Sequence, residues 1–469
     1  MSGAIRKERD VGTIRVAGRD ALFEPFRIKG VQFANRILRS SMGGRTACYD
    51  GTVSPAWRHF EKKFAKTGVA GIISATIDID EKRLSPLEYP KLSDDHFIAP
   101  LRAGVKEVQQ LGCRCIIQLG DPGGRTQTSL FSQKADTQAT SANFDLMYGY
   151  RNRTIPMTTG EVEREVEKFV QAARRVRDIG ADGLEITASK GYVIHQFLNP
   201  VTNRRRDRYG GSLYKRFQLL GEIVTGVRQI IGRDFLFGIR FPAEDHNYAP
   251  INLRLPIVFP RRDYWFGNML DQNLIYAKEL ERLGTNYLHV DSGFGFSNPK
   301  GNPRDYLYDG IRLFANSIRH LNTKATITAI IVNPIPTAIA RHTLGYGWKF
   351  KPAANADYAR AFKQNPSIPV ISNGGFQRQD VIENALAARK CDMIARAAVA
   401  CKSRPSQNLR LGPERVRQSP HLLQSMLEPV GSAGARVLRA QPFPVAGRDG
   451  AADYRLSGTT DDGENAVSA

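Results

Sequence analysis

Short apolar runs alternate with amphipathic stretches along most of this chain. Each run has the length of a buried strand, and the stretch that follows it repeats apolar residues every three or four positions, as a helix does. The predicted strands are 36–42, 71–76, 115–119, 183–186, 237–241, 287–292, 369–375 and 392–397. Eight strands that alternate with helices predict an α/β fold, a (β/α)8 TIM barrel, with parallel pairing.

The same periodicity predicts the helices between these strands. They are expected at 57–64, 97–111, 158–180, 217–231, 271–283 and 380–389. The third begins with a capping-box pair, Thr158 and Glu161, and ends at Gly180, a residue type that suits a helix C-terminus. No G-x-G-x-x-G sequence follows a predicted strand, so the pattern does not support a Rossmann domain.

Several long segments lack this periodicity. Residues 120–156 are rich in Gly, Ser, Thr and Asn, and a loop of that length in a compact domain is typical of a functional loop. Two insertions, 242–267 and 293–366, are expected to cover the substrate pocket; the second holds a helical stretch, an apolar run and an aromatic patch at 311–321, 327–332 and 345–348. We predict a polar arm at 1–20, a barrel at 21–411 and a largely disordered tail at 412–469.

Composition narrows the class of protein. The chain has 469 residues, 41% hydrophobic and 24% charged, with a net charge of +21. This charge favours anionic partners such as phosphorylated cofactors, CoA esters or nucleic acid, but the charges are scattered, which is more typical of a solvated basic surface. The five cysteines contain no C-x-x-C, so we expect a reducing, cytoplasmic setting and no metal site. No segment resembles a secretion signal or a membrane span, so no membrane partner is expected.

Polar residues near the carboxyl ends of the predicted strands are the candidates for chemistry, because barrel active sites lie at that end. Gln118 and Arg240 lie inside strands and need partners when buried. A planar cofactor with carbonyl and imide edges would satisfy both; an internal ion pair, such as Arg240 with Glu185, is the alternative. Gly374 and Gly375 end the seventh strand, where they form either a phosphate-binding turn or a plain tight turn.

Tyr192 follows the fourth strand among small residues. A phenol has an ordinary pKa near ~10, so it is protonated at neutral pH and suits general-acid donation. An aromatic side chain packed under a loop is the alternative. His195 is more typical of a hydrogen-bonded core histidine than of a catalyst. The charged segment 203–212 is interpreted as a structural clamp for the loop after this strand.

Taken together, these motifs resemble the Old Yellow Enzyme family of NADH:flavin oxidoreductases. The resemblance covers 22–395 and is nearest to the FMN barrel of 2,4-dienoyl-CoA reductase and to flavin barrels of bile-acid metabolism. Its most specific part is 191–211. The other matches are Leu22-Phe23-x-Pro25, Asn35-Arg36-Ile37, Ser41-Met42, Asp50-Gly51, Gly71-Ile72-Ile73-Ser74, Gln118-Leu119, Arg240 and Asn373-Gly374-Gly375-Phe376.

The resemblance implies FMN at the carboxyl face of the barrel, reduced by NADH or NADPH. It places Ser41, Met42 and Gly43 near flavin N5, Ala75 or Thr76 and Gln118 at the pyrimidine edge, Arg240 at N1 and O2, and Gly374 and Gly375 at the phosphate. It further implies hydride transfer from the flavin to the β-carbon of an activated C=C in a small unsaturated carbonyl compound, with Tyr192 protonating the α-carbon.

Two departures from the family pattern qualify this expectation. The substrate-binding His-x-x-His or His-x-x-Asn pair is replaced by Thr187 and Lys190, of which Lys190 could polarise a carbonyl or pair with a carboxylate. The phosphate-binding arginine is replaced by Ala398, so Arg396, two residues earlier on the same strand face, is the candidate, and FMN affinity is expected to be weakened.

These departures leave other functions open. One is a barrel that has lost turnover and serves as a scaffold; another is an amine or CH–CH dehydrogenase that runs in the oxidative direction. A flavin barrel acting on RNA is disfavoured, because no cysteine lies where the tRNA dihydrouridine synthases have their acid, so we expect no nucleic-acid partner. The pattern selects neither NADH over NADPH nor an oligomeric state.

Overall fold

The computed structural model describes the barrel and its nearest connections. The described residues are 21–44, 46–81, 89–126, 136–142, 144–145, 152–246, 267–294 and 350–396, with 308, 312–313, 315–316, 319–320 and 323–343 between the last two ranges. The predicted arm and tail, most of the insertion at 242–267, the aromatic patch at 345–348 and Ala398 lie outside them.

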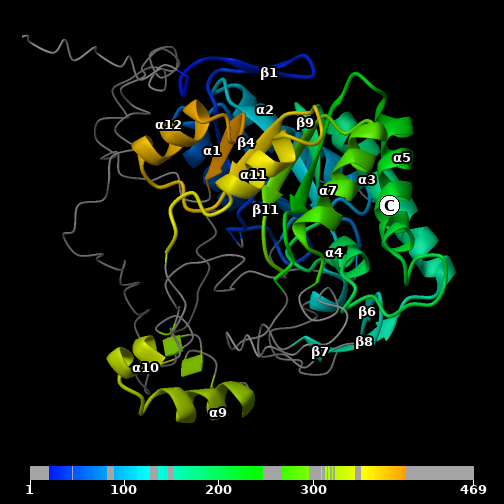
Figure 1. Ribbon diagram of the computed structural model, residues 1–469, viewed down its shortest axis with the longest axis vertical. Coiled ribbons are helices and arrows are strands. Elements are labelled where there is room, and N and C mark those ends of the chain that lie inside the picture. The colour runs from blue at the N-terminus through cyan, green and yellow to red at the C-terminus, as the bar shows by residue number, and fades with distance from the viewer. Residues whose placement is uncertain are drawn as a thin grey trace, which may run out of the picture. The chain divides into compact units, whose positions relative to one another are not determined.

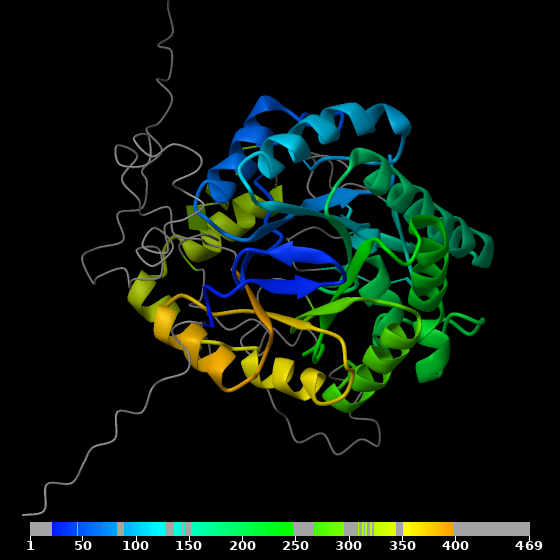
Figure 2. The same cartoon turned by 90° about the horizontal axis from the view of Figure 1, so that it is seen from above.

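Eight parallel strands close into a barrel, in the order β10-β11-β12-β13-β3-β4-β5-β9 (Figure 2). They are β3 (Ile37–Arg39), β4 (Gly71–Asp78), β5 (Arg114–Gly120), β9 (Gly183–Thr187), β10 (Leu236–Pro242), β11 (Tyr287–Asp291), β12 (Val370–Asn373) and β13 (Met393–Arg396). Each of the strands predicted from apolar runs is present, and the predicted (β/α)8 barrel is confirmed.

Helices surround the barrel, as the view along it shows (Figure 2). They are α1 (Pro55–Ala65), α2 (Ile98–Gln109), α3 (Thr159–Ile179), α5 (Leu213–Ile231), α7 (Leu270–Arg282), α11 (Ala356–Lys363) and α12 (Gln379–Ala387). The capping box at Thr158 and Glu161 is formed, and Gly180 ends α3 in the left-handed conformation, with φ of 81°.

The segment predicted as one insertion at 293–366 contains more structure than expected. It includes α9 (Thr323–Val332), α10 (Thr337–Thr343) and α11. Ala356, Ala359 and Phe362 on α11 join the main hydrophobic core, so α11 is a helix of the barrel itself. The sequence pattern missed α11 because three buried residues in an eight-residue helix make too short a stripe to stand out.

A β-hairpin closes the amino end of the barrel. It consists of β1 (Phe26–Ile28) and β2 (Val31–Phe33), joined at Lys29 and Gly30, both with positive φ as a tight hairpin turn requires. Ile28 and Phe33 pack against inward-facing strand residues, and this inner cluster fills the half of the barrel at the amino ends of the strands. The space left for a ligand therefore lies toward the carboxyl ends of the strands.

The carboxyl end carries its own short elements. The segment after β5, predicted as one irregular loop, contains the 3₁₀ helix η2 (Gly123–Arg125) and a three-stranded sheet in the order β6-β8-β7. These strands are β6 (Asp136–Ala139), β7 (Phe144–Asp145) and β8 (Asn152–Pro156), and a short helix, α4 (Val193–Leu198), follows β9. Figure 1 shows β6, β8 and α4 at the end of the barrel opposite β1.

Candidate active site

Strand register brings the predicted site residues together at the carboxyl end of the barrel. Thr76 lies opposite Gln118 across β4 and β5, and Thr187 lies opposite Arg240 across β9 and β10. The register of β4 shifts between Ile73 and Thr76, so this strand changes from apolar to polar inward residues at an irregularity.

Gln118 is the hub of one half of the site. Its Oε1 accepts hydrogen bonds from Ser41 Oγ at 2.8 Å and from Thr76 Oγ1 at 2.6 Å. Its Nε2 donates to Glu185 Oε1 at 2.6 Å. Three residues that the family resemblance assigns to the flavin, Ser41, Thr76 and Gln118, thus form one hydrogen-bonded group.

The neighbouring predicted flavin contacts differ in their surroundings. Ala75 is buried, and Met42 packs against the main core. A Cβ placed on Gly43 would overlap the phenol of Tyr89, so only glycine allows this ring to approach the backbone so closely. Tyr89 was not predicted, since it lies outside any family motif.

Asp291, at the end of β11, organises the other half of the site. Arg240 Nε donates to Asp291 Oδ2 at 2.8 Å, and Lys190 Nζ lies 3.4 Å from the same oxygen. Burial alone would raise the pKa of Asp291, but Lys190 and Arg240 outweigh it and hold the pKa below its usual value. The suggested ion pair of Arg240 with Glu185 is therefore wrong, because the register places Asp291 within reach instead.

The ammonium group of Lys190 is held at this place by a further hydrogen bond. Its Nζ also donates to the backbone oxygen of Ser292 at 2.6 Å, and its backbone has a φ of 59°, which is unusual outside glycine. Of its two predicted roles, the structure shows pairing with a carboxylate.

Tyr192 lies at the start of α4, buried, beside two threonines. A Cβ placed on Gly120 would lie 2.7 Å from the methyl groups of both Thr76 and Thr187, and 3.7 Å from the ring of Tyr192. Glycine at this position therefore lets the three side chains converge. Tyr192, the predicted acid, and Thr187, a predicted substrate-binding residue, therefore lie close together.

His195 has a structural role. The backbone N–H of Gly191 donates to its Nδ1 at 3.0 Å, so Nε2 carries the proton and donates to Asp245 Oδ1 at 2.8 Å. Asp245 Oδ2 accepts from the side chain of Asn199 and the backbone of Asn268, both at 2.8 Å. His195 is thus a satisfied core histidine that ties α4 to the connections after β10.

The charged segment after α4 forms the clamp that its sequence suggested. Asn203 Nδ2 donates to the backbone oxygens of Phe197 and Tyr209, each at 2.7 Å. Arg205 pairs with Asp207 and also donates to the backbone of Thr140 at 3.2 Å. These bonds join the segment that carries Tyr192 to the sheet formed after β5.

The predicted phosphate site combines glycines with a buried cation. Gly374 and Gly375 have φ values of 94° and 77°, and a Cβ on Gly375 would overlap the backbone of 351–353. Arg396 is 6% exposed, and burial lowers its pKa to about 10. Its Nη2 donates to the backbone of Gln377 at 3.1 Å, its Nε has no hydrogen-bond partner, and no carboxylate among the described residues pairs with it.

These residues fit FMN at both of its ends. A buried guanidinium without an anion is unfavourable, and a phosphate would supply the missing charge. At the other end, Gln118 and Arg240 offer the amide and cationic groups that the polar edge of a flavin requires. Arg396 can therefore stand in for the family arginine whose position is Ala398 here.

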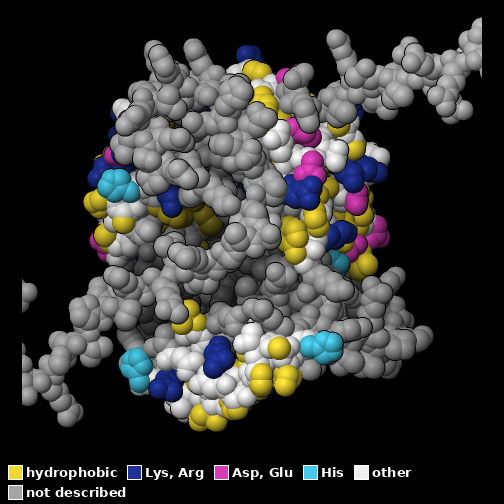
Figure 3. Space-filling model, turned by 90° about the vertical axis from the view of Figure 1, so that its left-hand side faces the viewer, with side chains coloured by type: hydrophobic (Ala, Val, Ile, Leu, Met, Phe, Trp, Pro, Cys, Tyr) yellow, Lys and Arg dark blue, Asp and Glu magenta, His cyan; other side chains and the backbone are white. Residues whose placement is uncertain are grey.

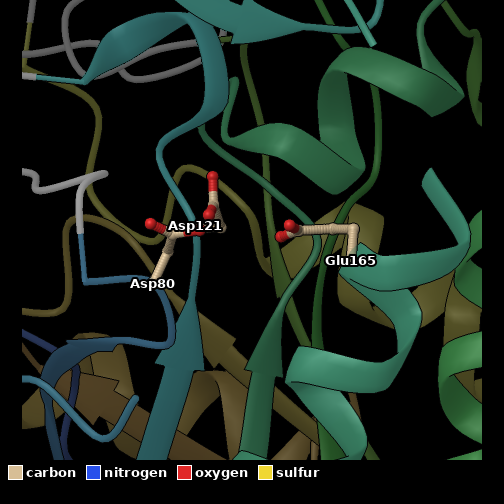
Figure 4. Close-up of side chains that lie close together, drawn as sticks. All are labelled: Asp80, Asp121 and Glu165. Carbon is tan, nitrogen blue, oxygen red and sulfur yellow. The ribbon is translucent and has the colours of Figure 1, made fainter. Parts of the chain in front are cut away.

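Three carboxylates that the sequence did not single out also lie near the carboxyl end. Figure 4 shows Glu165 extending from α3 toward Asp80 and Asp121, which follow β4 and β5. Their oxygens lie within 4.8 Å of one another, in the range of a metal-binding group. Lys168 pairs with Asp80 and lies 3.9 Å from Glu165, so an ammonium group already contributes positive charge to this cluster.

One face of the described surface is mixed in charge. Figure 3 shows Lys and Arg side chains interspersed with Asp and Glu on the face that it presents. A groove of about 520 Å³ lies between α5 and α7, on the outside of the barrel and away from the predicted site residues. No helix in the described part of the chain is long and apolar enough to cross a membrane.

Comparison with known proteins identifies the family of this chain. Residues 21–251 match the NADH:flavin oxidoreductase / NADH oxidase family. An NADPH dehydrogenase of Halalkalibacterium halodurans is 32% identical over 308 residues, covering 65% of this chain and 81% of that protein. An NADH oxidase of Thermoanaerobacter brockii is 25% identical over 440 residues, covering 92% of this chain. This chain spans only 56% of that longer protein.

Two solved structures share the fold. A 2-naphthoyl-CoA reductase in complex with 2-naphthoyl-CoA has a TM-score of 0.64 at 18% identity, covering 81% of this chain and 50% of its own. The Old Yellow Enzyme homologue of Zymomonas mobilis has a TM-score of 0.58 at 18% identity, covering 80% and 88%. The match of residues 21–251 and the 32% identity to the NADPH dehydrogenase, 81% of which this chain covers, show that the chain belongs to the NADH:flavin oxidoreductase / NADH oxidase family, the Old Yellow Enzyme family of FMN barrels.

Proposed function

We propose that this chain is an NAD(P)H-dependent FMN oxidoreductase of the ene-reductase type, which reduces the activated C=C of an unsaturated carbonyl compound. The observation that carries the proposal is the convergence of Tyr192 with Thr76 and Thr187 around Gly120, next to the Gln118 group. A proton donor beside a flavin edge is what alkene reduction requires.

Each residue then has a defined task. FMN supplies the hydride that adds to the β-carbon. Ser41, Thr76 and Gln118 hold its polar edge, and Arg240, oriented by Asp291, provides positive charge for it. Gly374, Gly375 and Arg396 hold the phosphate. Tyr192 gives its phenolic proton to the α-carbon of the substrate, so that one hydride and one proton saturate the double bond.

The replaced histidine pair sets the substrate class that we propose. Thr187 is buried at the carboxyl end and can donate a hydroxyl hydrogen to a substrate carbonyl, while Lys190 acts through Asp291 rather than by direct contact. The likeness to a reductase solved with a CoA thioester and the net charge of +21 both favour an enoyl thioester.

Flavin content and turnover together test the proposal. The purified protein is assayed for released FMN, then for NADH and NADPH oxidation with a panel of enones and enoyl thioesters, and separately for oxidation of amines by the bound flavin with an added electron acceptor. We expect FMN in the protein and substrate-dependent oxidation with an unsaturated carbonyl compound. A flavin-loaded protein that turns over only amines would instead indicate a dehydrogenase, and one that turns over nothing would indicate a scaffold.

A further inference from the structure

A buried carboxylate, Glu185, lies directly behind the cofactor-facing residues and has no role in the reaction described above. It is fully buried on β9. Its Oε1 accepts from Gln118 Nε2 at 2.6 Å, and its Oε2 accepts from Tyr287 Oη at 3.2 Å and from His289 Nδ1 at 3.1 Å. Three donors on two strands, Gln118 on β5 and Tyr287 and His289 on β11, therefore point at one carboxylate in the barrel interior.

The sequence makes room for this arrangement at Gly238. Glu185 lies opposite Gly238 in the register of β9 with β10, and Gly238 lies opposite Tyr287 in that of β10 with β11. A Cβ on Gly238 would overlap the ring of Tyr287. The missing side chain on β10 thus lets Tyr287 reach across that strand to Glu185.

The direction of the hydrogen bonds is consistent along the whole network. Asn355 Nδ2 donates to Asn373 Oδ1 at 3.1 Å, and Asn373 Nδ2 lies 3.1 Å from His289 Nε2. Since His289 Nε2 accepts, its Nδ1 carries the proton and donates to Glu185. Burial, aided by Glu185, raises the pKa of Tyr287, which keeps this phenol a donor as well.

We propose that Glu185 is a positioning residue for the cofactor site: it fixes the orientation of the Gln118 amide and places a carboxylate behind it. A carboxylate that only accepts must face the NH₂ end of the amide. The carbonyl end of Gln118 is therefore presented to Ser41 and Thr76, on the cofactor side. This inference rests on the proposed function, because it assumes FMN at that edge.

Charge and orientation lead to a measurable consequence. Adding electrons to a cofactor next to a fixed anion in a low-dielectric interior is disfavoured. Glu185 should therefore hold the midpoint potential of bound FMN more negative than it would otherwise be. Glu185→Gln keeps the size of the side chain but removes the charge, and it offers Gln118 either a donor or an acceptor, so the amide is no longer held in one orientation.

Comparison of Glu185→Gln with Tyr287→Phe tests the proposal. Tyr287→Phe is the matched control, because it removes one donor to Glu185 and keeps the carboxylate. FMN occupancy, FMN dissociation constant and midpoint potential are measured for the wild type and both variants. We expect Glu185→Gln to shift the potential of bound FMN to a more positive value and to weaken FMN binding by about tenfold, with smaller changes for Tyr287→Phe.

The outcomes separate this inference from the proposed function. A wild type that binds no FMN would contradict the function. If the wild type and the Glu185→Gln variant both bind FMN and the bound FMN has the same midpoint potential in each, the proposed role of Glu185 is wrong, whereas the proposed function is not affected.

A measurement on the unmodified protein covers the case in which Glu185→Gln does not fold. In ¹⁵N-histidine-labelled wild type, the network requires His289 to carry its proton on Nδ1, whereas His195 carries its proton on Nε2. A His289 ring protonated on Nε2, alone or together with Nδ1, would contradict the hydrogen-bond direction from which the Gln118 orientation was inferred.

Discussion

At the scale of single residues, two arginines mark the two ends of the proposed cofactor site, Arg240, which is partly buried, and Arg396, which is buried. Arg240 has its counter-ion in Asp291, whereas Arg396 has none among the described residues. A paired cation orients a ligand, but an unpaired one gains most from binding an anion. We therefore expect Arg396 to contribute more to FMN affinity than its departure from the family position suggests.

Replacing Arg396 tests that expectation. Arg396→Gln should raise the FMN dissociation constant by at least about tenfold, because a charge-assisted hydrogen bond is lost. Arg378→Gln is the control: this arginine precedes α12, is exposed and already pairs with Asp380. Fluorescence titration of the flavin-free proteins with FMN measures both. Equal affinity of Arg396→Gln and wild type would remove Arg396 from the phosphate site.

Tyr192 is tested by separating the two half-reactions. Tyr192→Phe should leave FMN reduction by NAD(P)H unchanged and slow reoxidation by an alkene by about a hundredfold, since only the second half needs a proton donor. Stopped-flow absorbance of the flavin measures each half. Unchanged alkene reoxidation would mean that another group supplies the proton.

The sequence predicts functional residues where a motif contains them and misses their partners. Tyr192, Gln118 and Arg240 were identified from their strand ends and the family pattern. Asp291 as the partner of Arg240 was not, because partner choice depends on the register of β10 with β11. Asp245 was missed for a similar reason. Its hydrogen-bond donors, His195, Asn199 and Asn268, come together only when α4 and the connection before α7 have folded.

At the scale of elements, Asp291 joins the ends of three strands through Lys190 after β9, Arg240 on β10 and its own position on β11. Asp291→Asn leaves a buried lysine and a partly buried arginine without their carboxylate and should lower the free energy of unfolding at neutral pH by about 3 kcal/mol. Asp178→Asn, which breaks an exposed pair with Arg174, should cost less than about 1 kcal/mol.

The same variant has a predictable pH dependence. The pKa of Asp291 is lowered by folding, so its stabilisation is fully present above the ordinary Asp pKa and is lost as the pH falls through the folded-state value. The difference in unfolding free energy between wild type and Asp291→Asn should therefore narrow below about pH 4. Urea denaturation between pH 7 and pH 3 measures it, and a difference that widens in acid would contradict the assignment.

Gly238 gives a second element-scale prediction. Gly238→Ala should force Tyr287 away from Glu185 and destabilise the protein by about 1–3 kcal/mol, because the barrel interior has no room for the added methyl. Gly160→Ala is the control, since its Cβ would meet only Arg164 at 3.7 Å, on the helix α3. Thermal melting of both variants decides: equal melting temperatures would mean that the barrel relaxes around residue 238.

Elements were predictable where their apolar pattern was long. All the barrel strands and α3 and α5, with their extended stripes, were found from sequence. The short strands β6, β7 and β8 were read as one loop, because strands of two to five residues in a polar segment show no period. The β1–β2 hairpin was missed although Lys29-Gly30 occupies a tight turn.

At the scale of the whole molecule, the interior of the barrel is apolar in the half at the amino ends of the strands and polar in the half at their carboxyl ends. The inner cluster that the hairpin closes contains Leu38, Ile73, Ile116 and Met393, while Gln118, Glu185 and His289 lie above it. A ligand that binds in the carboxyl half should stabilise the whole barrel, because a ligand that binds only the native state raises the free energy of unfolding.

FMN should therefore raise the melting temperature of the whole barrel. At an FMN concentration of ~100 times the dissociation constant, binding contributes about 2.7 kcal/mol. Riboflavin, which lacks the phosphate, should stabilise less, and the difference should be smaller in Arg396→Gln, which keeps only the turn at Gly374 and Gly375. Differential scanning fluorimetry without and with each flavin measures this. Identical melting curves for FMN and riboflavin in the wild type would contradict a phosphate site at Gly374, Gly375 and Arg396.

The most direct test of the central claim is an anaerobic single turnover. The FMN-loaded protein is reduced with one equivalent of NADH or NADPH and mixed with an enoyl thioester or an enone, while the flavin absorbance near its visible maximum is followed and the product is identified. The account predicts that the bleached flavin regains its yellow colour as the C=C becomes saturated. A flavin that stays reduced in the presence of every unsaturated carbonyl compound, yet reoxidises in air, would contradict it.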